Sequence, residues 1–137
     1  MGGISGISGI HCCGSTDWSL LLNTSTDIIS FDAYNYADSL STYTADVEKF
    51  LQRGGTIAWG IVTNFDEALE KETTASLFDR LGEAMAPYTR DGFSIKQLAA
   101  QSILTPSCGL ATLSIDGATE ALHLLAELSQ KIRSRYC

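Results

Sequence analysis

The chain alternates short, apolar, β-prone segments with segments whose apolar residues recur at helical spacing. The strand-like runs are Ser8–Cys13, Asp27–Asp32, Thr56–Val62 and Ser102–Thr105, the last of which ends at Pro106. Strands that alternate with helices are typical of βα units arranged around a parallel sheet. We therefore predict the α/β class, with four consecutive βα units.

Helical patterns fill the intervals between these runs. The expected apolar stripes are Val47, Phe50 and Leu51 in one helix, Leu77, Leu81, Ala84 and Met85 in a second, and Ala118, Ala121, Leu122, Leu125, Leu128 and Ile132 in the last. Thr44 is expected to cap the first of them, and Gly54 and Gly55 to end it. Pro87 should end the second helix, and the last should begin near Ser114. A shorter helix after Asp17 should carry Trp18, Leu21 and Leu22.

The composition excludes several classes of protein. With 45% hydrophobic and 18% charged residues, the chain is globular, and no apolar run approaches the roughly 18 residues of a membrane helix. Its 9 basic residues against 16 acidic ones leave a net charge of −7, so the basic stripe of a nucleic-acid binder is missing. We expect small-molecule or protein partners, with no nucleic acid and no membrane.

The cysteines are too few and too unevenly placed for a disulfide scaffold. They are Cys12, Cys13, Cys108 and Cys137. The amino-terminal residues have neither a basic segment nor a long apolar core, so no secretory signal is expected. We therefore expect a reducing, cytoplasmic environment, where thiols serve as ligands or nucleophiles.

Three of the expected strands lead into residues that can bind a metal. His11 and Cys13 are two residues apart, so they should point to one side of the sheet while Cys12 points to the other. Asp32 ends the second strand, and Cys108 follows the fourth. Ligands gather at the carboxyl ends of parallel strands. One imidazole, two thiolates and one carboxylate would suit Zn²⁺.

Each of these residues also has a structural interpretation. Buried cysteines often behave as small hydrophobic residues, and an aspartate at a strand end is often a cap or turn former. The alternative to a metal site is therefore a packed cysteine pair and a capping Asp32. Asn35 is placed on a loop after the second strand, where its amide could hydrogen-bond a substrate.

Other polar and aromatic residues are assigned to packing or solvent. Phe31, Tyr34, Tyr36 and Trp59 either line a pocket for a flat ligand or pack the rim of the sheet, and packing is favoured. His123 is expected at the surface, and the acidic run from residue 66 to residue 72 is expected to form a solvated helical turn.

Three blocks of the sequence resemble a known superfamily. Residues 10–16 (IHCCGST), 27–32 (DIISFD) and 104–110 (LTPSCGL) look like the C-terminal part of the superfamily that unites cobalamin-independent methionine synthase with uroporphyrinogen-decarboxylase-like methyltransferases. The resemblance spans about residues 8 to 132. Its methyltransferases bind zinc through a His-x-Cys pair, an acidic residue and a later Cys-Gly, which implies His11, Cys13, Asp32 and Cys108 as ligands. Asp32 stands where the methionine synthases have glutamate.

The resemblance implies both an activity and a fold. The activity is methyl transfer from a folate or corrinoid to a small thiol, such as homocysteine, held as a thiolate by zinc. The fold is the C-terminal half of a (β/α)₈ barrel, because a whole barrel needs about 250 residues and the chain has 137. Residues 1–137 would then form one partial domain, completed by a second copy or by a separate N-terminal half.

Two other functions stay open at this point. One is a catalytically inert zinc-binding or structural half-barrel that needs a partner. The other is a protein that resembles uroporphyrinogen decarboxylase, for which these thiol ligands are unnecessary and the arginine-rich substrate contacts are absent.

Overall fold

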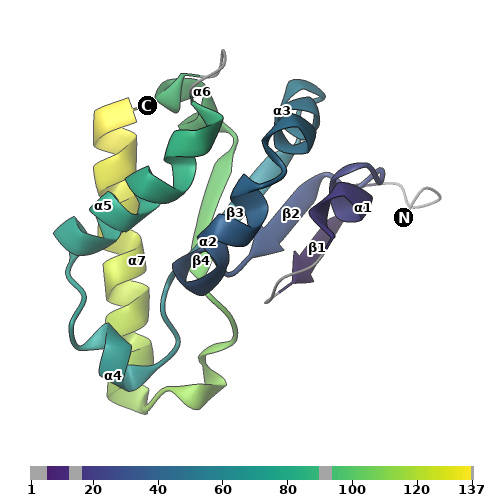
Figure 1. Cartoon of the computed structure of the whole chain (residues 1–137). Helices are drawn as coiled ribbons and strands as arrows, with labels where there is room; N and C mark the ends of the chain where they lie inside the picture. The colour runs from purple at the N-terminus through teal and green to yellow at the C-terminus, as the bar shows by residue number, and fades with distance from the viewer. Residues whose placement is uncertain (1–5, 13–16, 90–93, 137) are drawn as a thin grey trace.

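The protein is built on a four-stranded parallel sheet with the strand order β1-β2-β3-β4. The computed structural model shown in Figure 1 describes residues 6–12, 17–89 and 94–136. Its strands are β1 (Gly9–Cys12), β2 (Ile28–Phe31), β3 (Thr56–Val62) and β4 (Ser102–Pro106). The predicted α/β class and the four predicted strands are confirmed, although Cys13 lies outside the described residues.

Helices connect and follow the strands. They are α1 (Trp18–Leu22), α2 (Ala33–Ser41), α3 (Thr44–Gln52), α4 (Asp66–Leu69), α5 (Thr74–Met85), α6 (Ile95–Ala100) and α7 (Ile115–Tyr136), with 3₁₀ turns at Ala86–Tyr88 and Leu110–Thr112. The predictions of α1, α3, α5 and α7 are confirmed. Within the described ranges, none of the helices has the length and apolar character needed to cross a membrane.

Two details of the predicted helices were wrong. Tyr43, not Thr44, precedes the first turn of α3, and no side chain caps that helix. In α7 the side chain of Leu122 is 53% exposed, whereas Leu124 is buried. Ala121, Leu124 and Leu128 follow one another by three and four residues, so they define the inner stripe, and Leu122 lies about 100° around the helix from Ala121. Gly54 has a φ of +90° and ends α3 as expected.

Two helices were not predicted. Helix α2 was assigned to a loop, and it begins because the Asp32 side chain accepts a hydrogen bond from the Asn35 backbone N–H. Helix α6 begins with a capping box between Ser94 and Gln97. The Ser-x-x-Gln spacing of this box is a recognisable start signal in the sequence.

The register of the strands divides their side chains between two faces. Ile10, Ile29 and Ile57 are aligned with one another. Two residues further along each strand, Cys12, Phe31 and Trp59 are aligned in the same way. The helices pack against this set, and the fully buried members of both groups belong to one apolar cluster. In Figure 1, helices α1, α2 and α5 lie on the viewer's side of the sheet. The prediction that Cys12 points away from His11 is confirmed.

A chain of aromatic rings runs across this cluster. The ring centroids of Trp18 and Phe31 are 5.7 Å apart, those of Phe31 and Trp59 are 5.4 Å apart, and those of Trp59 and Tyr88 are 5.9 Å apart. All four side chains are completely buried. Serine hydroxyls accept from both indole N–H groups. The Tyr88 hydroxyl has no hydrogen-bond partner among the described residues.

The opposite side of the sheet is called the open face below. Its residues alternate with the core set; they are Gly9, His11, Ile28, Ser30, Thr56, Ala58, Gly60, Ile103 and Thr105. None of them belongs to the apolar cluster that the helices form. The Ile103 side chain is 44% exposed. The sheet therefore has one covered face and one that lacks a packed layer within the described chain.

Replacing Tyr88 with phenylalanine should stabilise the protein. A buried hydroxyl without a partner loses its hydration and gains nothing in return, so Tyr88→Phe should raise the free energy of unfolding by about 1 kcal/mol. Urea unfolding measures the change. Tyr34→Phe is the matched control, because the Tyr34 hydroxyl donates to Glu72 over 2.9 Å, and its loss should lower stability. A lower stability of Tyr88→Phe would contradict the prediction.

Candidate functional site

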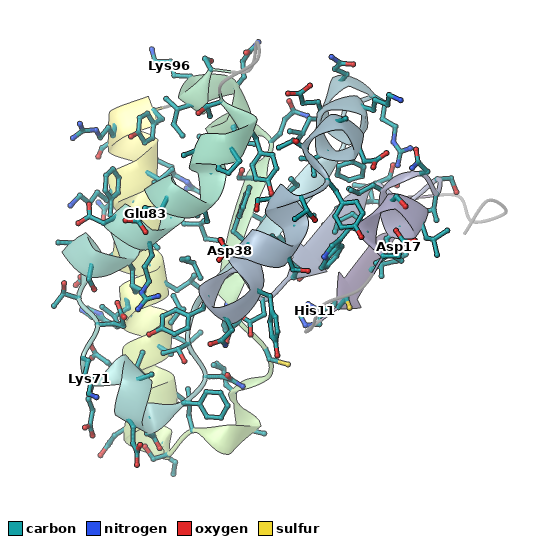
Figure 2. The ribbon with its side chains drawn as sticks, viewed as in Figure 1. His11, Asp17, Asp38, Lys71, Glu83 and Lys96 are labelled. Atoms are coloured by element: carbon teal, nitrogen blue, oxygen red, sulfur yellow. The ribbon has the colours of Figure 1, made fainter. Side chains whose placement is uncertain are left out.

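A depression of about 310 Å³ lies at the carboxyl end of the open face. It is lined by His11, Ser30, Thr105, Pro106, Cys108 and Gly109. Figure 2 shows the His11 side chain at the carboxyl end of β1. These residues come from both edges of the sheet, whose outer strands in a flat sheet would lie about 14 Å apart. Since they share one depression, the sheet curves toward its open face here.

The His11 ring is held by a hydroxyl on the neighbouring strand. His11 and Ser30 are aligned in the register of β1 and β2, and His11 Nδ1 and Ser30 Oγ share a hydrogen bond of 2.8 Å. In the tautomer in which Nδ1 carries the proton, the Nε2 lone pair is available to a ligand. Metal-binding histidines typically have their second ring nitrogen held in this way.

Cys108 lies on a turn that is hydrogen-bonded to the carboxyl end of β3 and to the residues after it. The Ser107 backbone N–H donates to the Val62 carbonyl oxygen over 2.7 Å. The completely buried Ser107 hydroxyl donates to Asn64 Oδ1 over 3.1 Å, and Asn64 Nδ2 donates to the Gly109 carbonyl oxygen over 3.3 Å. These bonds flank the half-buried Cys108 on both sides, so they set where its thiol lies.

Gly60 makes room for this turn. A Cβ atom at Gly60 would lie 2.6 Å from the Phe31 carbonyl oxygen, 2.9 Å from Ser107 Cα and 3.0 Å from the Pro106 carbonyl oxygen. All three are backbone atoms, which cannot rotate away as a flexible side chain can. The close approach of β4 and its turn to β3 therefore requires glycine at this position.

Asp32 has the capping role that the sequence left open. Its side chain is buried; Oδ1 accepts from the Asn35 backbone N–H over 2.9 Å, and Oδ2 accepts from the Asn35 side-chain amide over 2.8 Å. The placement of Asn35 on a loop was wrong, because it lies in the first turn of α2. A carboxylate has about four lone-pair positions, so these bonds leave acceptor capacity on both oxygens.

The structure brings together only some of the four predicted ligands. The structure brings His11 and Cys108 to one depression, whereas Asp32 does not line it and Cys13 lies outside the described residues. Within residues 6–12, 17–89 and 94–136, no three His, Cys, Asp or Glu side chains form a cluster that could hold a metal. The complete ligand set remains a prediction.

Thr105 carries an unused hydroxyl at the same depression. Its Oγ1 atom is buried and has no hydrogen-bond partner in the described part of the chain. Buried hydroxyls of this kind usually bond to protein, water or ligand. Thr105, Ser30, Asn64 and Ser107 were all missed as site residues, because strand pairing alone brings them together and no local motif marks them.

A second, larger depression of about 650 Å³ includes Tyr34, Phe65, Glu72 and Arg80. The Glu72 carboxylate accepts from Tyr34, from Arg80 Nε over 3.1 Å and from Ser76 over 2.6 Å. Its side chain is only 6% exposed, so the prediction of a solvated turn was wrong for this residue.

Phe31 and Trp59 are fully buried, which confirms the packing interpretation for them, while Tyr36 is 38% exposed.

The pKa of Glu72 lies below the ordinary value of a glutamate. Burial raises this pKa, but the hydrogen bonds from Ser76 and Tyr34 and the positive charge of Arg80 together outweigh burial. The Arg80 guanidinium also lies 4.3 Å from the centre of the Tyr34 ring. Glu72 is therefore an ionised group that links α2 to α5.

His123, as predicted, is exposed, and it pairs with Glu127.

Comparison of the chain with protein-family models gives no match, and comparison with curated proteins gives no significant match either.

Adding one methyl group at Gly60 should displace the Cys108 turn. Because the new Cβ would overlap backbone atoms, Gly60→Ala should lower the free energy of unfolding by about 1–3 kcal/mol. The matched control is Gly82→Ala on α5, where a Cβ meets nothing within 4 Å. That change should raise stability by up to about 1 kcal/mol. Equal stability of the two variants in urea unfolding would contradict this account of Gly60.

Glu72 should make the stability of the protein dependent on acid pH. Its folded-state pKa is lowered, so the ionised carboxylate stabilises the fold above the ordinary glutamate pKa of about 4.3, and this contribution is lost as the pH falls through the folded-state value. Glu72→Gln should reduce stability at pH 7 and flatten the acid limb of a stability–pH curve. Glu83→Gln, which alters an exposed carboxylate on α5, should leave both unchanged. An acid limb that keeps its slope in Glu72→Gln would contradict the assignment.

Proposed function

We propose that the protein is a zinc-dependent methyltransferase, or a part of one, that activates a small thiol such as homocysteine. The observation that carries this proposal is the meeting of His11 and Cys108, from opposite edges of the sheet, in one depression at the carboxyl ends of the strands. That end of a parallel sheet is where ligands bind in α/β proteins.

The sheet supports the half-barrel part of the proposal. Its strands follow one another in chain order and are all parallel. Its helices pack on one face, and its carboxyl end curves toward the other. A (β/α)₈ barrel has this arrangement, with helices outside and a closed sheet inside. Doubly wound sheets differ, because helices cover both of their faces.

The ligand set combines the described residues with the sequence pattern. His11 offers Nε2 and Cys108 offers its thiolate. Cys13 follows His11 by two residues in the sequence, the spacing that places two side chains on the same side of a strand. Asp32 supplies a carboxylate that retains lone pairs beside its capping bonds. Such a mixture of thiolate, imidazole and carboxylate suits Zn²⁺.

The surrounding residues would orient these ligands and the substrate. Ser30 fixes the His11 ring, and the bonds from Ser107 and Asn64 fix the turn of Cys108. The Thr105 hydroxyl, which has no partner among the described residues, would bond a polar group of the substrate. When bound, zinc supplies the positive charge that keeps a substrate thiol as a nucleophilic thiolate near neutral pH. The methyl donor would be a folate or a corrinoid.

A zinc-binding half-barrel without activity of its own is the second candidate. The observation that favours it is the small size of the depression, about 310 Å³. This volume is at the lower limit of the roughly 300–1,000 Å³ typical of pockets that enclose a drug-sized ligand. A folate or corrinoid would need more surface than this depression offers.

Zinc analysis of protein purified without chelators tests the site. The wild-type chain should carry close to one zinc, and His11→Ala, Cys13→Ser and Cys108→Ser should each lose it. Asp32→Asn retains a good helix cap, so it should keep the fold while weakening zinc binding. Cys12→Ser is the matched control, because Cys12 packs toward the core, and zinc should be unchanged.

Retention of stoichiometric zinc in both Cys13→Ser and Cys108→Ser would overturn the site. Incubating the zinc form with homocysteine and a methyl donor then separates the two candidates. Formation of the thioether supports the methyltransferase, whereas zinc binding without product supports the inert half-barrel.

A further inference from the structure

We propose that the open face and both edges of the sheet form an interface with a second copy of this chain, so that two four-stranded halves close into one eight-stranded barrel. The proposal rests on the half-barrel part of the proposed function and does not depend on zinc. It is argued from the sheet edges, from the exposed apolar side chains and from the charges at the two edges.

The two edges can pair with each other. Strand β1 pairs with β2 alone and β4 pairs with β3 alone, so each outer strand has one unpaired side in the described chain. All four strands run in one direction. A copy related by a two-fold axis along the barrel would place its β1 beside β4, and its β4 beside β1, with every pair parallel. The contact therefore closes after two copies and leaves no free edge.

Exposed apolar side chains accompany both edges. Leu20, on the helix that follows β1, is 69% exposed, and Ile7, just before β1, is 80% exposed. At the other edge, Ile103 of β4 is 44% exposed and Leu122 of α7 is 53% exposed. Burial of such side chains against a partner removes apolar surface from water and favours association.

A groove lies beside β4, at the edge of the sheet where the partner's β1 would pair. It has a volume of about 470 Å³, and it is lined by β4, by α6 and by Ile132 and Arg133 of α7. In a (β/α)₈ barrel the helices form a ring outside the strands, so α7 would lie over the groove between β4 and the next strand. In the proposed assembly that strand is the partner's β1.

Opposite charges are found at the same end of the two edges. Arg133, in the last turn of α7, lines the groove beside β4 near the start of that strand, as the position of the carboxyl terminus in Figure 1 shows. Asp27, exposed at the start of β2, accepts a hydrogen bond from the backbone N–H of Ser8, just before β1. Closure places Arg133 of one copy at the same end of the barrel as Asp27 of the other. Such complementarity favours the parallel alignment over the reverse one.

The mass of the full chain in solution tests the proposal first. Light scattering after size exclusion should give twice the chain mass of 14.7 kDa. Ile103→Arg would put an unpaired charge inside the closed barrel, so it should give a monomer with an unchanged circular dichroism spectrum. Phe65→Arg is the matched control: Phe65 is 57% exposed and follows β3, an inner strand of the sheet, and the dimer should persist.

Hydrogen exchange then identifies the surface that pairs. Amides of β1 and β4 that point to the free edges should be protected in the dimer and should lose that protection in Ile103→Arg. Amides bonded between β2 and β3 should stay protected in both. A wild-type monomer, a dimer that survives Ile103→Arg, or a dimer whose edge amides exchange freely would each overturn the closure.

Zinc content measured on the same samples keeps the two proposals apart. A monomer that binds zinc would overturn the closure and leave the zinc site standing. A closed dimer without zinc would support the closure and overturn the zinc site.

Discussion

The two-residue alternation of side chains along four aligned parallel strands is the constraint on which the other features depend. It places Phe31 and Trp59 under the helices and directs Ser30 and Ala58 to the other side. A shift of one residue in the pairing of β2 with β3 would exchange these sets on β2 and put Ser30 in the core. The core, the open face and the candidate site therefore follow from one register.

The large, fully buried side chains of the aligned strands, such as Ile29, Phe31 and Trp59, lie on the covered face. The rings of Trp18, Phe31, Trp59 and Tyr88 meet edge to face or tilted, the arrangements that aromatic pairs prefer. Complete burial of such a ring removes about 150–250 Å² from water, worth about 4–6 kcal/mol as an upper estimate. The open face has mainly glycine, serine, threonine and alanine, with Ile28 and Ile103 as its large apolar members. The open face therefore offers little apolar surface for a helix to bury.

The candidate site depends on backbone approach as much as on its reactive side chains. Gly60 allows the turn after β4 to come close to β3, and the buried pair of Asn64 and Ser107 holds it there. Removing one partner of a buried polar pair leaves the other without compensation, so the pair is also a structural requirement. The same residues that position Cys108 thus contribute to the stability of the carboxyl end of the sheet.

The amino-acid pattern was sufficient to predict the α/β class, the four strands and the opposite directions of His11 and Cys12. These features depend on local periodicity: apolar residues repeat every two positions in a strand and about every 3.6 positions in a helix, and both repeats are visible in the sequence. Helix α2 was not predicted because its first turn depends on Asp32 as the N-cap. The sequence left open whether Asp32 is a helix cap or a metal ligand. The α6 capping box was present in the sequence but is short.

The pairing order of the strands, which local periodicity does not record, decided the rest. His11 and Cys108 are far apart in the chain, and only the curvature of a four-stranded sheet brings both to one depression. Glu72 has the sequence neighbours of a solvated residue, yet Tyr34 and Arg80 from two other turns of helix surround it. Burial, hydrogen bonding and the shift in its pKa arise from these distant partners, because electrostatic and packing energies depend on separation in space and not along the chain.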